Sequence, residues 1–183
     1  MAKDLVLCIA AALTILCFSW SGSFTAWAQF DDNGKVGTWT TGPVARRHEQ
    51  SENPHLKVVR VAKQKRFDRL VFEFTGPMPN YSIRYLKGRF YEDEGGSHRI
   101  RIAGTAFMQV TFNQIPMDEI QAGFSTGKKF SPEGRLKLPA LQEVQEKTLF
   151  EGFYDFLLGI RSRRAFRVTE LQNPARVVID FRH

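Results

Sequence analysis

From Leu56 onward, apolar and polar residues alternate in short runs that are separated by Gly, Pro, Asn and Asp. The clearest run is Leu70-Val71-Phe72-Glu73-Phe74. Because a strand places successive side chains on opposite faces, this alternation gives one apolar and one polar face. No window longer than about ten residues has a helical period. The pattern predicts an all-β fold, a two-sheet β-sandwich, with strands at 57–63, 69–75, 81–86, 99–103, 107–112, 144–150, 153–160, 166–171 and 176–181.

An internal repeat relates the two ends of this region. A shift of 107 residues lays the segment 60–74 on the segment 167–181, with Arg69 on Arg176 and Glu73 on Asp180. In each copy the Arg and the acid are four positions apart, so on a strand they share a face. The repeat predicts two copies of one hairpin and hence pseudo-symmetric halves, although any two amphipathic hairpins would give the apolar matches. We interpret the pairs Asp68-Arg69 and Arg176–Asp180 as cross-strand salt bridges that set the register.

The first 28 residues have the form of a secretory leader. An apolar run over residues 5–18 follows Lys3, and Ala26-Trp27-Ala28 supplies the small residues of a cleavage site. We expect cleavage after Ala28 and no stable transmembrane segment in the mature chain; an uncleaved membrane anchor is the alternative. Both cysteines, Cys8 and Cys17, lie in the leader, which excludes disulfides and thiol chemistry in the mature protein and favours a bacterial periplasmic or extracellular location.

Two regions follow the leader. Residues 29–55 are polar, contain Gly and Pro, and have no period, which predicts a flexible N-terminal arm. Residues 56–183 are long enough for one domain with a hydrophobic core, the β-sandwich.

The mature chain is basic. Removing the leader removes one Lys and one Asp, which leaves 25 basic and 18 acidic side chains and a net charge of +7. Such a charge favours anionic partners, which at an envelope are wall carboxylates, teichoic or lipid phosphates, or acidic proteins. The export signal argues against nucleic acid. The alternative is that the charge only keeps the protein soluble.

No catalytic or metal-binding motif is present. The four histidines, His48, His55, His98 and His183, are scattered without the spacing of metal ligands, and no nucleophile motif accompanies them. The acidic run 92–94 precedes Gly95-Gly96, which is typical of an exposed turn rather than of a general acid and base. We therefore expect no enzymatic activity, no metal and no cofactor.

Clusters of basic residues are the candidate binding sites. Guanidinium groups bind carboxylates and phosphates in a bidentate manner, and exposed aromatic rings can stack on sugars. The candidates are Arg161, Arg163, Arg164, Arg167, Lys65, Arg66 and Tyr85. For each of the charges the alternative is a solvated loop residue without a ligand.

Several short segments together resemble the bacterial AMIN-like domain over residues 56 to 182. The segments are Phe67-Asp68-Arg69-Leu70-Val71-Phe72-Glu73-Phe74-Thr75-Gly76-Pro77, Tyr81, Tyr85, Phe150-Glu151-Gly152, Gly159-Ile160, Phe166-Arg167-Val168 and Pro174-Ala175-Arg176-Val177-Val178-Ile179-Asp180. The resemblance implies a compact sandwich of two related sheets and a non-catalytic role in localising to, or binding, peptidoglycan. The related AMIN domain is an envelope-targeting module attached to N-acetylmuramoyl-L-alanine amidases and secretins.

Together these observations predict a non-catalytic, exported cell-envelope binding module that recognises peptidoglycan or another anionic envelope glycan. The first alternative is an adaptor that holds another exported protein through a sheet edge or the arm. The second is a glycan-active enzyme.

Overall fold

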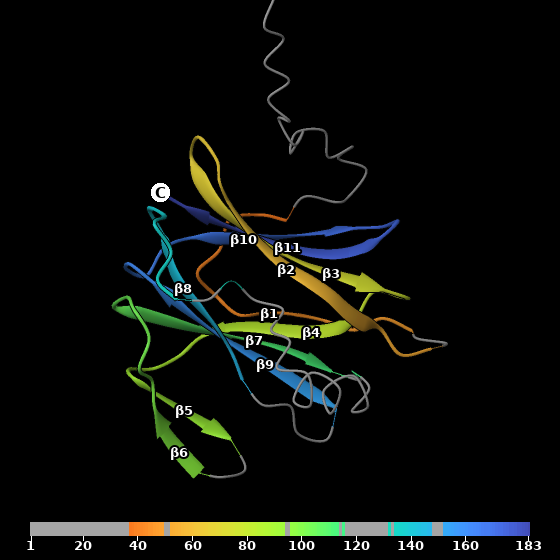
Figure 1. Ribbon diagram of the computed structural model, residues 1–183, viewed down its shortest axis with the longest axis horizontal. Coiled ribbons are helices and arrows are strands. Elements are labelled where there is room, and N and C mark those ends of the chain that lie inside the picture. Colours follow the sequence, from red (N-terminus) through yellow and green to blue (C-terminus); the bar gives the residue numbers. More distant parts are fainter. Residues whose placement is uncertain are drawn as a thin grey trace, which may run out of the picture. The chain divides into compact units, whose positions relative to one another are not determined.

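The computed structural model describes residues 37–49, 52–93, 96–113, 115, 132, 134–147 and 152–183. These residues form two antiparallel sheets, which appear as an upper and a lower layer in Figure 1. The five-stranded sheet has the order β1 (Val44–Arg46), β4 (Asn80–Tyr85), β7 (Ala106–Asn113), β9 (Phe153–Ile160), β8 (Leu141–Glu146). The four-stranded sheet has the order β10 (Phe166–Leu171), β11 (Ala175–Arg182), β3 (Phe67–Thr75), β2 (His55–Lys63). A separate hairpin joins β5 (Phe90–Asp93) to β6 (Gly96–Arg99).

Phenylalanines from both sheets fill the space between them. Phe72 of β3 lies with its ring centroid 4.9 Å from those of both Phe112 and Phe156, which belong to the opposite sheet. The three side chains are fully buried. Edge-to-face pairs of this kind add about 1 kcal/mol each to the free energy gained by burying their surface. The predicted two-sheet sandwich is therefore confirmed, and period-two alternation decides which residues enter its core.

The internal repeat corresponds to a local two-fold relation within the four-stranded sheet. The hairpins β2–β3 and β10–β11 lie side by side, and β3 pairs antiparallel with β11. Val71 is paired with Val178, its own equivalent in the repeat. The pseudo-symmetry thus relates two hairpins of one sheet.

Part of the segment predicted as an arm belongs to the fold. Gly37 N and Thr40 N donate to the carbonyls of Val168 and Phe166 at 3.0 and 2.8 Å, and strand β1 pairs with β4. A Cβ on Gly37 would lie 2.3 Å from the Val168 carbonyl oxygen, so the contact is too close for a side chain. Residues 37–49 therefore bond through their backbone to β10 of one sheet and β4 of the other. Because backbone bonding does not require alternating side chains, this segment shows no period in the sequence. Residues 29–36 and 50–51 of the predicted arm lie outside the described residues.

The strand predicted at 99–103 is wrong. Strand β6 ends at Arg99, and the chain then crosses the outer face of β9 at Gly159, where a Cβ would lie 1.8 Å from the Ala103 carbonyl oxygen. Ile100 and Ile102 alternate because both pack on Leu157, not because they belong to a ladder. The strand predicted at 144–150 is β8, which begins earlier and ends at Glu146; residues 148–150 lie outside the described part.

Candidate functional site

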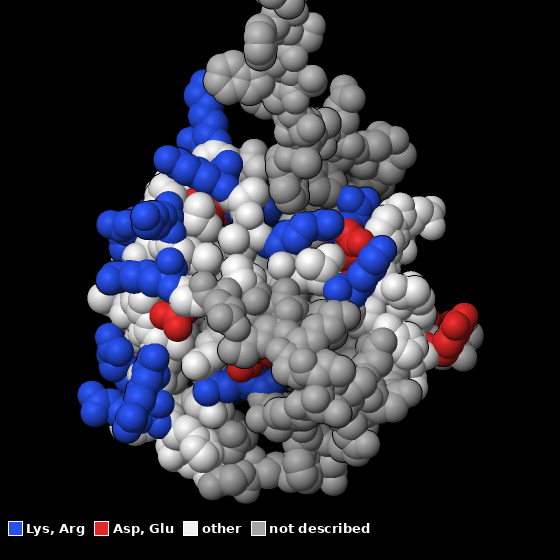
Figure 2. Space-filling view, in the orientation of Figure 1, with Lys and Arg blue, Asp and Glu red and all other residues white. Residues whose placement is uncertain are grey.

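An open cleft of about 580 Å³ lies at one end of the sandwich, between ends of strands from both sheets. We call it the basic cleft, because its lining includes Lys63, Lys137, Arg161, Arg164 and His183, with Leu136, Leu138, Pro139 and Gln142 completing it. None of these nine lining residues is acidic. In Figure 2 the Lys and Arg atoms gather along one side of the molecule, the side on which the C-terminus lies in Figure 1.

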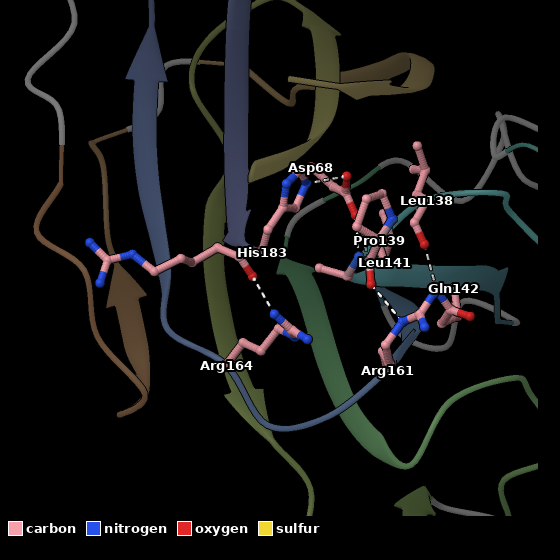
Figure 3. A network of polar contacts seen from close by, with 10 residues as sticks. Asp68, Leu138, Pro139, Leu141, Gln142, Arg161, Arg164 and His183 are labelled. Carbon is pink, nitrogen blue, oxygen red and sulfur yellow. Dashed lines mark hydrogen bonds and ion pairs between the residues drawn. The ribbon is translucent and has the colours of Figure 1, made fainter. Parts of the chain in front are cut away.

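Asp68 of β3 lies beside this cleft and is fully buried. Its Oδ2 accepts hydrogen bonds from the backbone N–H groups of Ala140 and Leu141 at 2.6 and 2.9 Å. Its Oδ1 lies 2.8 Å from Nε2 of His183 (Figure 3). The carboxylate thereby ties β3 to the start of β8 and fixes the His183 ring, so its own charge is used within the protein.

Among the described residues, the guanidinium groups of Arg161 and Arg164 donate only to carbonyl oxygens. Arg161 Nε donates to Pro139 O at 2.7 Å, and Arg164 Nη1 donates to Arg182 O at 3.4 Å (Figure 3). Arg164 Nε is buried and has no hydrogen-bond partner. A buried donor without a partner costs about 1–3 kcal/mol. Neither guanidinium has a carboxylate partner among the described residues.

Tyr85 supports the loop between β9 and β10. Its hydroxyl donates to Arg164 O at 2.8 Å and accepts from Arg164 N at 3.1 Å. Burial raises the pKa of Tyr85, against the smaller opposing effects of the Arg164 backbone and of the Arg163 and Arg164 charges. Arg163 lies 4.7 Å from the Tyr85 ring centre and donates to Thr41 O. Tyr85 and Arg163 therefore hold the loop in place rather than line the cleft.

A second group of charges covers the outer face of the four-stranded sheet. Arg69 donates two hydrogen bonds of 2.7 and 3.0 Å to the Asp180 carboxylate, and Arg167 Nε donates to the same carboxylate at 2.9 Å. The Asp180 side chain is 1% exposed. Trp39 and Phe67 lie against these guanidiniums, with Arg167 Cζ 4.9 and 5.2 Å from their ring centres. Arg167 is therefore neutralised on the sheet and does not join the basic cleft.

The equivalent carboxylate in the other hairpin is Glu73. It pairs with Arg60, the repeat equivalent of Arg167, and lies 3.6 Å from Lys57 Nζ. Arg176, the equivalent of Arg69, faces Glu73 in the register and donates from Nε to Pro174 O at 3.3 Å. Burial lowers the pKa of Arg176, and the charge of Glu73 opposes this shift.

The structure thus corrects our interpretation of the charge pairs. Asp68 and Arg69 are neighbours on one strand, so they point to opposite faces, Asp68 inward to His183 and Arg69 outward to Asp180. Asp180 likewise takes its cations from neighbouring strands and not from Arg176.

Lys65 and Arg66 lie in the turn between β2 and β3 and do not line the cleft. The Arg66 carbonyl accepts a hydrogen bond from His183 N at 3.1 Å, so the turn lies beside the cleft. Sequence reasoning missed Lys137 and His183 as cleft residues. One sequence feature could have indicated this site. Asp68 is a charged residue at an inward position of β3, and the equivalent position in the repeat is the apolar Ala175.

Within the described residues, no group of three or more His, Asp and Glu side chains is placed to hold a metal ion. The same part of the chain contains no helix with the length and apolarity needed to cross a bilayer.

Comparison with known families identifies one model that fits this chain, that of the AMIN-like domain, which matches residues 54–183. The match includes both sheets except β1. Searches of the curated proteins and of the solved structures returned no match. The family match indicates an envelope-associated module of a generally non-catalytic kind.

Proposed function

The chain belongs to the AMIN-like domain family, and from this premise we propose that it is an exported cell-envelope module that binds an acidic envelope glycan, peptidoglycan first of all, through the basic cleft. In this proposal residues 1–28 direct export and are removed, and the domain acts in the periplasm or outside the cell. The role of the domain is to hold the protein, or a partner, at the wall, with no catalytic step of its own.

One observation carries the proposal, the gathering of unneutralised cations around an open cleft. Lys63 and Lys137 are exposed, and neither makes a hydrogen bond or an ion pair with a described residue. Asp68, which contacts the lining residue His183, is buried and already accepts three hydrogen bonds. Because like charges gathered in one place repel one another, such a group is more stable with a bound polyanion than without one.

Peptidoglycan has the matching chemistry, since its peptide stems carry free carboxylates at regular intervals along a polymer. Arg161 and Arg164 provide two guanidinium groups, which suit carboxylates, and Lys63 and Lys137 provide two point charges. A polymer presents many copies of the anion, so a weak single contact is sufficient for retention on the wall.

Retention on purified sacculi tests the proposal. The double substitution K63E/K137E reverses two cleft charges at exposed positions, and K87E/R99E makes the same charge change next to and on the β5–β6 hairpin, away from the cleft. Wild type and K87E/R99E should sediment with sacculi, and K63E/K137E should stay in the supernatant. Equal retention of the two double variants contradicts the role of the cleft, and failure of the wild type to sediment contradicts peptidoglycan as the ligand.

A second set of substitutions tests the loop. R161A and R164A should each weaken retention severalfold, because each removes one cleft guanidinium, whereas R163A should have a smaller effect, since Arg163 is directed to Thr41 and Tyr85. A larger loss for R163A than for R161A would place the contact outside the cleft.

A further inference from the structure

We propose that the outer edge of β2 is a docking site for an extended segment of a partner protein, whose aromatic side chain enters a cavity beside Lys57. The cavity shares no lining residue with the basic cleft, and the inference goes beyond the proposed function. It rests on the local two-fold relation of the four-stranded sheet, because the chain itself fills the equivalent site on β10.

A segment from the N-terminal part of the chain occupies the edge of β10. Thr40 N donates to Phe166 O and Phe166 N donates to Thr40 O, both at 2.8 Å, and Gly37 N donates to Val168 O at 3.0 Å. The segment thereby adds a short antiparallel strand to the sheet. The edge of β2 has no such cover, since none of residues 56–63 makes a backbone–backbone hydrogen bond with a described residue outside β3.

Trp39 is the side chain that this segment places on the sheet. Its ring centre lies 4.9 Å from the Cζ atoms of both Arg167 and Arg182, and 6.3 Å from the ring centre of Phe67. A cation over an aromatic face is attracted by the quadrupole of the ring. The site of Trp39 is therefore formed by three residues, one each from β10, β11 and β3.

The other hairpin has counterparts of these three residues. The two-fold relation between β3 and β11 makes Thr75 the counterpart of Arg182 and Pro174 the counterpart of Phe67. Both counterparts lie at the end of β3 that is opposite to Asp68 and the basic cleft.

In space Lys57, and not Arg60, stands where the other hairpin has Arg167. Glu73 is paired with Val58, and a β-bulge adds Lys57 next to Val58. Lys57 Nζ lies 3.6 Å from the Glu73 carboxylate, as Arg167 Nη2 lies 2.9 Å from the equivalent carboxylate. Arg60 lies two positions beyond Val58, because the two hairpins differ in register.

A cavity of about 280 Å³ lies among these counterparts. Its lining includes all three of them, Lys57, Thr75 and Pro174, together with Phe74, Gly76, Gln172, Asn173 and Ala175. One half of the sheet thus holds Trp39 against a cation and an apolar ring, and the other half offers an exposed cation and a proline ring around an open space.

The occupant of β10 indicates what the edge of β2 binds. Residues 37–40 combine main-chain hydrogen bonds to an edge strand with one aromatic ring set between small and hydroxyl residues. When a peptide adds a strand to a sheet edge, the main chain gives affinity and a pocket for one side chain gives specificity. The partner is therefore a protein that presents an aromatic residue in an extended segment.

NMR titration with a peptide copy of residues 37–42, Gly-Thr-Trp-Thr-Thr-Gly, tests the inference. The peptide should shift the backbone amides of residues 56–59 and 173–176, and leave residues 166–168, which the chain covers itself, unchanged. The peptide with Trp39→Ala should bind about tenfold more weakly, because it lacks the ring. A peptide methylated at the Thr40 nitrogen should also bind severalfold more weakly, because it loses a main-chain donor.

A matched pair of protein variants tests the cavity. T75R places a guanidinium where the other half has Arg182 over Trp39, so it should tighten binding of the peptide about threefold. S97R adds the same charge at an exposed position of the β5–β6 hairpin and should bind as the wild type does. Equal affinities of the two variants would overturn the placement of the ring in the cavity.

Absence of shifts at millimolar peptide, shifts confined to β10, or equal binding of the peptide with Trp39→Ala overturns the inference. Should T75R fail to fold, the wild type with the three peptides decides. Shifts of the cavity residues by soluble peptidoglycan fragments, but not by the peptide, would assign the cavity to a glycan and likewise overturn the inference.

Discussion

The outer face of the four-stranded sheet and the basic cleft both carry several Lys and Arg side chains, but among the described residues only those on the sheet have carboxylate partners. Arg69 and Arg167 share Asp180, and Arg60 and Lys57 share Glu73. Around the cleft the guanidiniums bond to carbonyls, and Asp68 is used by His183 and the backbone. The comparison separates charges that are paired within the fold from charges without such a partner, and the latter are the ones that we propose contact a ligand.

The two carboxylates of the sheet also differ from one another, although the repeat makes them equivalent. Asp180 is 1% exposed and its arginines are 18% and 22% exposed, whereas Glu73 is 10% exposed and its partners Arg60 and Lys57 are 34% and 63% exposed. Trp39 and Phe67 cover the arginines of Asp180. Because solvent screens an exposed pair, the same spacing of Arg and acid contributes more to stability in the covered copy.

The largest effect should follow from D180N, which leaves Arg69 and Arg167 without their shared carboxylate. Removing one partner of a buried ion pair typically costs 3–5 kcal/mol, and the partial exposure of both arginines leads us to expect about 3 kcal/mol. Urea denaturation measures this, and retention on sacculi should remain unchanged at temperatures where the variant is folded. A cost under about 1 kcal/mol, or loss of retention in the folded variant, would contradict the different roles that we assign to the charges of the sheet and of the cleft.

D68N should destabilise the protein by about 2 kcal/mol, since the carboxylate that accepts three hydrogen bonds becomes an amide with one acceptor oxygen and an NH2 group that cannot accept. Thermal and urea unfolding both report this loss. In contrast to D180N, this variant should also alter binding, because His183 loses its anchor. Retention of the folded variant on sacculi provides that comparison, and unaltered retention would argue against a role of the positioned His183 in binding.

E73Q should cost about 1 kcal/mol, because Arg60 and Lys57 are solvated and lose less when the charge of Glu73 is removed. The informative quantity is the difference from D180N in the same urea series. Equal costs for the two substitutions would show that cover by Trp39 and Phe67 has no energetic consequence.

K63E/K137E should leave stability unchanged or raise it by up to about 0.5 kcal/mol, since it relieves repulsion with Arg161 and Arg164. A calorimetric melting temperature equal to or slightly above that of wild type supports cations kept for binding. A clear loss of stability would mean that these lysines hold the fold, as the arginines of the sheet do.

The sequence predicted the sandwich well, because alternation of apolar residues directly reports which side chains face the core. It also identified the repeated hairpins, whose matched Arg and acid form the two charge clusters of the sheet. The error at 99–103 arose because Ile100 and Ile102 alternate while packing on a strand rather than pairing with one.

The candidate site was only partly predictable. Arg161 and Arg164 were identified as candidates from their local density of charge. Lys63, Lys137 and His183 come from three other segments that meet only when both sheets have formed. Contacts of that kind leave no local pattern, and the inward position of Asp68 was the one feature that pointed to a buried charge there.

NMR titration of the folded domain with soluble peptidoglycan fragments tests the central claim most directly, since it reports contact residue by residue. We predict that the backbone amide shifts will concentrate at residues 136–138, 161–164 and 182–183, with little change on the outer face of the four-stranded sheet away from the cleft. Shifts centred on Arg60, Glu73 and Arg176 instead, or no shifts at all, would contradict the assignment of the cleft charges to a ligand.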